Sequence, residues 1–350
     1  MKKTIKATVV GLTGVLALTA CTSNDIGGGG SKDTLSLVGF SVLETANDAE
    51  FKAFEDTDAG KDIDFAPSYG ASGDQSRAVE AGAEADIVHF SLETDMKRVV
   101  DAGLVAEDWK DNATNGIATS SVVVFVVRKG NPEGIAGWDD LVKDGTSIVA
   151  ANPGSSGAAR WSMLAAWQHV IGNGGTEDEA KEYISQLLAN TPVLPASARD
   201  ATSAFLEGDQ DVLITYENEA ILAKQNGTDI DYVIPEDTLL IENPAAVTVD
   251  AKDGAQDFLD FLESAEGQEI YAGYGFRPTA GVEGVEVPEV EGANDPANPF
   301  PTPAQLFTID GDFGGWSEAA EKFFADGEDG EPLGIVIDLI EKSGSDAQED

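Results

Sequence analysis

The sequence predicts an α/β fold, and three observations support that prediction. Strand-like apolar runs alternate with amphipathic, helix-like runs along the chain, which is typical of this fold class. Three of the junctions between a strand and a helix consist largely of Ser, Gly and Ala. The chain has 350 residues, which is long enough for two domains and a sizeable core, and 42% of them are hydrophobic.

Short runs rich in Val, Ile, Leu and Phe predict strands, and apolar residues spaced for a 3.6-residue turn predict helices. In the first third of the chain we expect strands at 35–40, 63–66 and 85–90, and helices at 49–54, from the turn at 69–75 to about 81, and at 95–102. Beyond it we expect strands at 121–128, 147–151, near 193, 211–216 and 245–249, and helices from 161, at 176–189, after the turn at 197–202, and one or two helices at 255–271. Pro, Gly and Glu predict a surface loop at 281–303.

The turn at 152–161, N-P-G-S-S-G-A-A-R-W, is the most informative stretch. The first N–H groups of a helix lack partners within the helix, and small residues let an anion approach them closely. Similar turns occur at 69–75 and 197–202. Three converging helix starts would supply about +1.5 charge, which nearly balances a dianion without Lys or Arg. The alternative is that all three are ordinary strand-to-helix turns, and that Ser155 or Ser156 caps the helix after the turn at 152–161.

The N-terminus is typical of an exported lipoprotein. Three lysines precede an apolar run at 7–20, which predicts an export signal over residues 1–20. Cys21 is the only cysteine, so no intramolecular disulfide can form. Because Cys21 directly follows Leu-Thr-Ala, the junction resembles a bacterial lipobox, which predicts lipid attachment to Cys21. The Gly-rich stretch within residues 21–33 predicts a flexible linker.

The charge excludes one class of partner and leaves others open. With 64 acidic and 21 basic residues the net charge is −43, so no basic surface could neutralise the phosphates of a nucleic acid. The acidic residues are scattered, which favours a hydrated surface. Asp310-Gly311-Asp312 does not continue into the twelve-residue calcium pattern, so we expect neither a metal nor a cofactor.

Six segments together resemble one protein family, and they occur in family order over residues 35–325. The segments are Y-G-A-S-G-D-Q-S-R-A-V at 69–79, V-V-R-K-G-N-P at 126–132, the turn at 152–161, D-V-L-I-T-Y-E-N-E at 211–219, G-F-R-P at 275–278, and L-F-T-I-D-G-D-F-G-G-W at 306–316. They look like the sulfate-binding proteins of bacterial ABC importers.

The resemblance implies a two-lobe periplasmic-binding-protein-like fold of type II, with a mixed sheet in each lobe and the ligand in the cleft between them. Lobe 1 would comprise residues 34–120 and 245–342, lobe 2 would comprise 121–244 including a crossover strand, and 343–350 would be a disordered tail. The protein would be a monomer, anchored by lipid to the outer face of the cell membrane, and its partner would be an ABC permease. It would not be an enzyme.

The resemblance also assigns the ligand-binding residues. Its anion would be held by neutral hydrogen-bond donors: Ser72, the hydroxyl and backbone N–H of Ser156, and the backbone N–H groups of Gly157, Ala158, Ala198 and Val42. Tyr216 stands where family members have a tryptophan whose indole N–H donates to sulfate. A tyrosine hydroxyl can donate or accept, so the role of Tyr216 stays open.

Other ligands and other functions stay open for this sequence. Thiosulfate, molybdate or tungstate would suit the same fold. A serine hydrolase would need Ser72 or Ser156 beside His89 or His169, but neither histidine lies in a recognisable triad context. A tethered adhesion module would explain the lipobox but not the three turns. The acidic residues nearest the turns are expected to be helix-start charges or structural pairs: Asp74, Asp200 and Glu217.

Overall fold

The computed structural model describes residues 32–327 and 332–343. The predicted export signal, Cys21 and most of the linker lie outside the described residues, as does the tail from 344. The linker was expected to reach residue 33, but Asp33 already begins the first strand, and Lys32 contacts Asp64 at 3.1 Å. In the described part, none of the helices has the length and apolar character that crossing a membrane requires.

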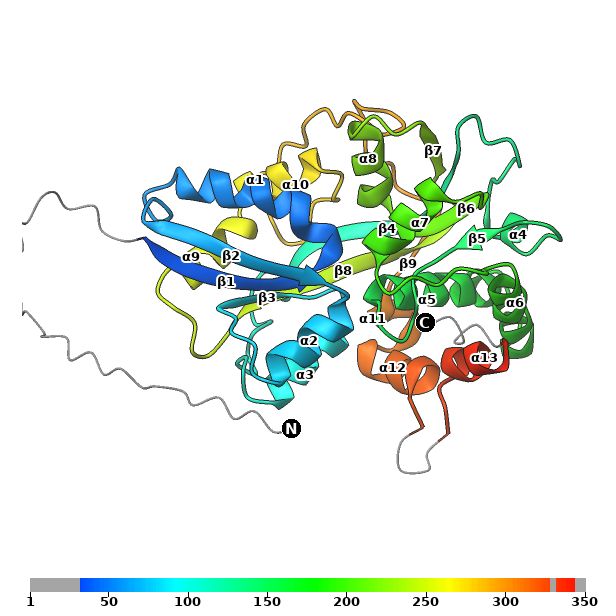
Figure 1. The fold of residues 1–350 in the computed structure, drawn as a ribbon, viewed down its shortest axis with the longest axis horizontal. Coiled ribbons are helices and arrows are strands. Elements are labelled where there is room, and N and C mark those ends of the chain that lie inside the picture. The colour runs from blue at the N-terminus through cyan, green and yellow to red at the C-terminus, as the bar shows by residue number, and fades with distance from the viewer. Residues whose placement is uncertain (1–31, 328–331, 344–350) are drawn as a thin grey trace, which may run out of the picture. The chain divides into compact units, whose positions relative to one another are not determined.

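One mixed sheet organises the described chain (Figure 1). Its strand order is β2-β1-β3-β8-β4-β6-β5, with β7 beside β4 and β9 beside β8. The strands are β1 (Asp33–Phe40), β2 (Ile63–Gly70), β3 (Ile87–His89), β4 (Ile117–Arg128), β5 (Ile148–Val149), β6 (Val212–Tyr216), β7 (Ile230–Val233), β8 (Asp237–Val247) and β9 (Gln305–Phe307). β2 and β3 run parallel to β1, and β5 runs parallel to β6.

The long strands β4 and β8 join the two ends of this sheet. The first part of β4 pairs with β8 and its second part with β6 and β7, whereas the end of β8 pairs with β3. The run expected at 121–128 lies in β4, which begins earlier, and the run expected at 245–249 overlaps the end of β8, which begins earlier and ends at Val247. We call β1–β3 with their helices the first half, and β5–β7 with theirs the second half. The boundaries of the two predicted lobes stay predictions.

Five helices and a 3-10 turn accompany the strands of the first half. They are η1 (Ser41–Leu43), α1 (Glu44–Glu55), α2 (Ser72–Glu80), α3 (Glu93–Asp101), α9 (Ala255–Leu262) and α10 (Ala265–Gly273). The rings of Phe51, Phe65 and Phe258 pack together, with centroids 4.2 to 5.5 Å apart. This aromatic cluster holds α1 and α9 against β2, so it fixes the turns that leave the ends of β1 and β2.

The second half is built around α5. Its helices are α4 (Trp138–Leu141), α5 (Gly157–Gly172), α6 (Glu177–Ala189), α7 (Ala198–Glu207) and α8 (Glu217–Gln225). Most residues of α5 are buried and its apolar side chains face all directions, as expected of a helix enclosed by its neighbours. Because α5 is enclosed, its N-terminal end has a fixed position.

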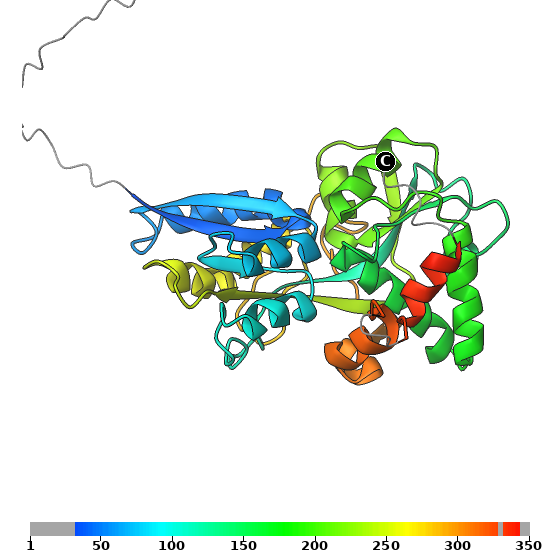
Figure 2. The same ribbon diagram turned by 60° about the horizontal axis from the view of Figure 1, so that its bottom comes forward.

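The C-terminal segment packs on α5 and α6 (Figure 2). It comprises β9 and the helices α11 (Ile309–Phe313), α12 (Trp316–Phe324) and α13 (Ile335–Ser343). Trp316 meets Trp161 with ring centroids 4.7 Å apart, and Phe323 meets Trp167 at 4.9 Å. The sequence assigned this segment to lobe 1, but these contacts are with helices of the second half. Ser343, expected in a disordered tail, ends α13.

Candidate functional site

The three small-residue turns are helix starts, as the sequence predicted. Ser72 is the first residue of α2, Gly157 of α5 and Ala198 of α7. Ser156 occupies the N-cap position of α5, and Ser197 caps α7 by accepting a hydrogen bond from the backbone N–H of Asp200. Each start therefore directs first-turn N–H groups away from its own helix.

Contacts between the halves bring these starts together. The N–H of Gly73 in α2 donates to the carbonyl of Ser155, just before α5, at 3.3 Å. On the other side, the Arg199 guanidinium of α7 donates to the carbonyl of Val42 in η1 at 3.4 Å. Residues that are more than 80 positions apart in the sequence are thus brought into contact. The structure brings Val42, Ser72, Ser156 and Ala198 into one neighbourhood.

Tyr216 lies in the same neighbourhood. It ends β6, it is fully buried, and its hydroxyl is 2.7 Å from the hydroxyl of Ser91. The ring packs against Phe40 at the end of β1, with centroids 6.3 Å apart. Burial raises the pKa of Tyr216 above its usual value, although the nearby side chains of Ser91 and Asn243 oppose that rise. Tyr216 is therefore a neutral hydroxyl at neutral pH.

Ser91 is the residue that the sequence analysis missed. It follows β3 by two positions, is 1% exposed, and donates its backbone N–H to the Ser72 hydroxyl at 2.8 Å. Its carbonyl accepts hydrogen bonds from the Trp161 indole and the Asn243 amide, both at 3.0 Å. A small polar residue just past a buried parallel strand was the available signal, because ligands gather at such strand ends.

The Ser72 hydroxyl has a protein partner. It donates to Asp95 at 2.6 Å, and Ser76 donates to the other oxygen of that carboxylate at 3.4 Å. Burial raises the pKa of Asp95, while the Ser72 hydrogen bond and the nearby charge of Arg160 lower it. With its hydroxyl turned toward Asp95, Ser72 has its backbone N–H to offer a ligand. The part played by Ser72 in binding stays a prediction.

The start of α5 is shaped by Gly157. A Cβ atom at this residue would lie 2.3 Å from the Ser91 hydroxyl oxygen, a distance that real Cβ atoms do not reach. Ser156 is 4% exposed, and within residues 32–327 and 332–343 no hydrogen-bond partner occupies its hydroxyl. Ala158 is buried beside it. The backbone N–H of Ser156, which the sequence predicted to bind the ligand, instead donates to the Asn152 carbonyl at 2.8 Å. This end of α5 therefore offers the Ser156 hydroxyl and the first backbone N–H groups of the helix.

The charges around these turns are paired. Arg199 binds Glu219 at 3.0 Å, and Arg77 binds Asp74 at 2.5 Å. The three acidic residues nearest the turns behave as the sequence predicted, as helix-start or structural charges: Asp74 with Arg77, Asp200 with the Ser197 hydroxyl at 2.7 Å, and Glu217 with Arg277 at 2.6 Å. These side chains neutralise each other, whereas the Arg160 guanidinium donates to the Pro153 carbonyl at 3.0 Å and lies over the ring of Phe324.

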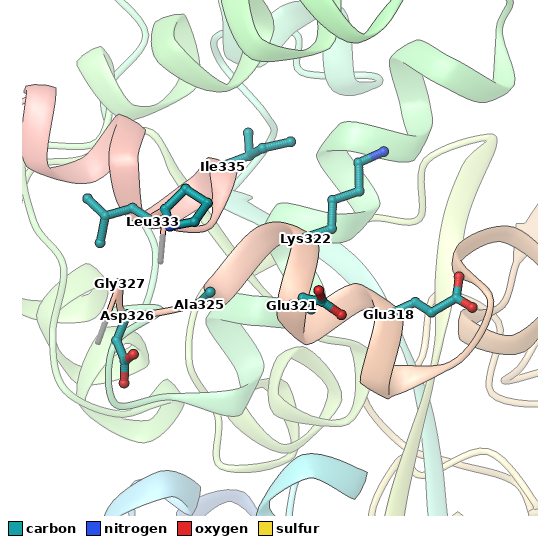
Figure 3. A pocket seen from close by; sticks show the side chains of 9 residues that line it. Glu318, Glu321, Lys322, Ala325, Asp326, Gly327, Leu333 and Ile335 are labelled. Atoms are coloured by element: carbon teal, nitrogen blue, oxygen red, sulfur yellow. The ribbon is translucent and has the colours of Figure 1, made fainter. Parts of the chain in front are cut away.

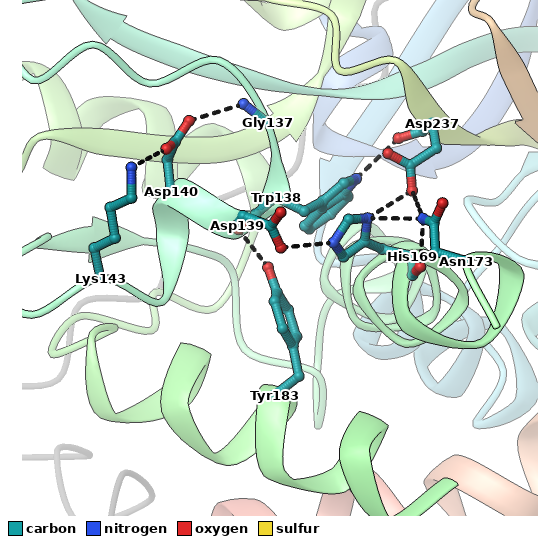
Figure 4. Close-up of polar contacts among 9 residues, drawn as sticks. All are labelled: Gly137, Trp138, Asp139, Asp140, Lys143, His169, Asn173, Tyr183 and Asp237. Carbon is teal, nitrogen blue, oxygen red and sulfur yellow. Dashed lines mark hydrogen bonds and ion pairs between the residues drawn. The ribbon is translucent and has the colours of Figure 1, made fainter. Parts of the chain in front are cut away.

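The described residues do not form the side-chain geometry that a serine hydrolase or a metal site would need. His89 is buried beside Thr119 at 3.3 Å, and burial lowers its pKa to about 3. His169 lies near the far end of α5, between Asp237 and Asp139 (Figure 4). Neither histidine contacts Ser72 or Ser156 in the described chain. In the same residues, no cluster of three or more His, Cys, Asp or Glu side chains could hold a metal.

A pocket also opens between the end of α12 and the start of α13 (Figure 3). Three acidic residues and Lys322 share its lining with apolar side chains such as Leu333 and Ile335. None of the predicted site residues lines it. It is not part of the candidate site.

Known proteins resemble this chain over most of its length. The bacterial extracellular solute-binding protein family matches residues 41–277. The sulfate-binding protein of Synechococcus elongatus is 40% identical over 326 residues, which cover 89% of this chain and 91% of that protein. The thiosulfate-binding protein of Pseudomonas aeruginosa is 36% identical over 288 residues, covering 79% and 84%. The solved sulfate-binding protein SubI of Mycobacterium tuberculosis superposes with a TM-score of 0.77 at 39% identity, covering 84% of this chain and all of that one.

These similarities confirm the fold class that the sequence predicted. The mixed sheet with flanking helices is that of type II periplasmic binding proteins. The family match over residues 41–277 spans the turns at Ser72, Ser156 and Ala198, and the sulfate-binding relatives cover most of the chain.

Proposed function

This chain belongs to the bacterial extracellular solute-binding proteins, and among them to the sulfate-binding proteins, and from that premise we propose that it captures sulfate and delivers it to the permease of an ABC importer. The observation that carries this proposal is the contact between three helix starts, beside which Arg77 and Arg199 are paired with carboxylates. Sulfate accepts hydrogen bonds and donates none at neutral pH, so it suits a site made of donors.

Seven groups form the proposed site. They are the backbone N–H groups of Val42, Ser72, Gly157, Ala158 and Ala198, the Ser156 hydroxyl, and the hydroxyl at Tyr216. A hydrogen bond to a charged group contributes about 1.5–3 kcal/mol, and association costs on the order of 4–15 kcal/mol. A dissociation constant in the micromolar range, about −8 kcal/mol, is the expected balance.

The donor pattern also favours sulfate over phosphate. Hydrogenphosphate carries a proton that needs an acceptor, and it would leave one buried donor of the site facing that proton. Thiosulfate is the strongest alternative ligand, because one of the relatives is a thiosulfate-binding protein. Molybdate and tungstate, which present the same tetrahedral oxygens, are further alternatives within the same class.

The setting of the protein follows from its family. Family members work outside the cytoplasm, and this chain is proposed to be held there by lipid on Cys21, with residues 22–32 as the tether. It is proposed to act as a monomer with two lobes that close over the anion. The contacts from Gly73 to Ser155 and from Arg199 to Val42 support such closure, because they join the halves around the site.

Calorimetric titration of the EDTA-dialysed protein tests the proposal. We expect one sulfate per chain, micromolar affinity, and weaker binding of phosphate. Thiosulfate and molybdate titrated in parallel rank the alternatives. Binding that disappears after EDTA and returns with calcium would contradict a metal-free site. An absence of binding to all four anions would refute the proposed function.

A further inference from the structure

Two buried hydroxyls in the candidate site lie within hydrogen-bond distance of each other, and the proposed function does not explain one of them. The oxygens of Ser91 and Tyr216 are 2.7 Å apart, and both residues are at most 1% exposed. They come from different halves of the molecule, Ser91 after β3 and Tyr216 at the end of β6. A role for this pair in ligand binding rests on the proposed function of the chain.

Counting hydrogens shows what this pair can offer. Two hydroxyls carry two hydrogens, and their mutual hydrogen bond uses one, so one remains. Either hydroxyl can be the donor of this bond, and the Asn243 amide nitrogen donates to the Ser91 carbonyl at 3.0 Å. With Tyr216 as the donor, the unused hydrogen is that of Ser91. In the described residues the Ser91 hydroxyl has no hydrogen-bond partner other than Tyr216.

The position of Ser91 directs that hydrogen toward the start of α5. The Ser91 oxygen lies where a Cβ of Gly157 would come within 2.3 Å, so it is next to the first-turn N–H groups of that helix. The Ser91 backbone is fixed on both sides by hydrogen bonds to Ser72, Trp161 and Asn243. A buried donor held in one place beside unpaired backbone donors is what a site for an oxyanion requires.

We propose that Ser91 donates its hydroxyl hydrogen directly to the bound oxyanion, and that Tyr216 is a positioning residue that donates to Ser91. Ser91 accepts a hydrogen bond from the Tyr216 hydroxyl and donates one to the ligand. The Tyr216 hydroxyl therefore polarises the Ser91 hydroxyl, which then donates more strongly to the anion. The ligand class is a tetrahedral oxyanion without a bound proton, of which sulfate is the probe. In this arrangement Ser91 takes the place of Tyr216 among the seven donors proposed above, and Tyr216 acts on the anion only through Ser91.

A double-mutant cycle with sulfate in a calorimeter separates these roles. Ser91→Ala removes the donor to the anion, and we expect the dissociation constant to rise roughly tenfold to hundredfold. Tyr216→Phe leaves the Ser91 hydroxyl in place but less firmly oriented, and we expect a rise of roughly threefold to tenfold. In the Ser91→Ala background, Tyr216→Phe should add less than a factor of about two, because its only route to the ligand is gone.

Ser162→Ala is the matched control. Ser162 is as buried as Ser91, but its hydroxyl donates to the Ala158 carbonyl within α5 at 3.0 Å. We expect this variant to keep the wild-type affinity, whatever happens to its melting temperature. If Ser91→Ala does not fold, Ser91→Cys replaces it, because a thiol keeps the side chain but is a weak donor; its affinity should also fall by roughly tenfold.

The outcomes are distinct. If Ser91→Ala, or its Cys substitute, binds sulfate within about twofold of the wild type while Tyr216→Phe loses about tenfold, Tyr216 is the direct donor and the proposal is wrong. Additive losses in the cycle would also contradict it, since they would give each hydroxyl its own contact with the anion. A wild-type protein that binds no oxyanion would instead refute the proposed function, independently of Ser91.

Discussion

The two ends of α5 have different electrostatic surroundings: mainly neutral hydrogen-bond donors at the N-terminal end, and charged side chains near the C-terminal end. At the N-terminal end, Ser156, Gly157 and Ser91 present hydroxyls and backbone N–H groups, and the nearby ionised side chains are paired with one another. Near the C-terminal end, His169 lies directly between two carboxylates, 2.7 Å from Asp237 and 3.2 Å from Asp139 (Figure 4). The helix dipole favours an anion at the first end and a cation at the second.

The difference between the two ends shows how the fold uses neutral donors for a reversible contact with a ligand and charged groups for a permanent contact within the protein. At the His169 end, Trp138 donates to the Asp237 carbonyl at 2.9 Å and Tyr183 donates to the Trp138 carbonyl at 2.6 Å, so charged and neutral groups form a fixed network. A ligand that must be released gains from dipoles and hydroxyls that already point at it, because such donors need no counter-charge when the site is empty. We call the N-terminal end of α5, with its neutral donors, the neutral end, and the end at His169 the charged end. The neutral end is therefore the one suited to transport.

The largest effect is expected where the neutral end is most tightly packed. Gly157→Ala should weaken sulfate binding by about 3 kcal/mol, because its Cβ would displace the Ser91 hydroxyl or the start of α5. Gly137→Ala is the control: Gly137 has an extended backbone, and a Cβ there would have no neighbour within 4 Å. Equal affinities for the two variants, measured by calorimetry, would show that the α5 start does not bind the anion.

Removing one donor from the neutral end should have a smaller effect. Ser156→Ala takes away a buried hydroxyl with no protein partner in the described chain, and we expect sulfate binding to weaken by about 1–2 kcal/mol. Ser155→Ala in the same turn is the control, because the Ser155 hydroxyl donates to the Ala196 carbonyl at 2.8 Å. If Ser155→Ala weakened binding as much as Ser156→Ala, the turn as a whole would matter and the Ser156 hydroxyl would not.

The charged end should respond to pH in its stability and leave binding unchanged. Burial alone would lower the pKa of His169, but its hydrogen bonds to Asp237 and Asp139, and their charges, outweigh burial and raise it. A raised pKa in the folded state stabilises the protein fully below pH about 6.5, and this stabilisation is lost as pH rises through the folded-state pKa.

His169→Gln tests this end of the comparison. We expect the wild type to exceed the variant by about 1–2 kcal/mol in unfolding free energy at pH 6, and by less at pH 9, as followed by thermal melting. The sulfate affinity of His169→Gln should equal that of the wild type at both pH values. A gap in stability that widens toward pH 9 would contradict the assigned charge of His169.

Salt gives the smallest effect and concerns how the anion reaches the neutral end. At a net charge of −43 the protein repels a dianion, over about 10 Å at 0.1 M salt and about 3 Å at 1 M. Stopped-flow association should therefore become a few-fold faster between 0.05 and 1 M NaCl, with little change in dissociation. An association rate that falls steeply would reveal a local positive entrance formed by Arg77, Arg160 or Arg199, despite the partners of Arg77 and Arg199.

The sequence predicted the helix starts of the neutral end, whereas it did not predict the contacts of the charged end. The turns before α2, α5 and α7 carry their own local signal, because small residues, a serine cap and a following apolar helix are adjacent in the chain. The pairing of His169 with Asp237 joins residues 68 positions apart, and no spacing pattern announces it. Local chemistry was predictable, whereas partners brought together by the sheet were not.

The missed parts of the site and fold have the same cause. Ser91 and Asp95 become recognisable only when β3 lies beside β1 and α3 reaches the Ser72 turn. β9 has three residues and is a strand because it pairs with β8, and α13 owes its place to α6. Short elements of this kind depend on tertiary contacts more than on their own propensity.

The measurement that tests the role of neutral donors most directly is proton linkage during sulfate binding. Calorimetric titrations at pH 7.0 to 8.5, in buffers that differ in ionisation enthalpy, report any proton taken up with the anion. We predict a constant dissociation constant and no proton uptake, because Tyr216 and His89 both stay neutral over this range. An affinity that falls as pH rises, together with uptake of a proton, would contradict the neutral site and assign the anion a cationic partner.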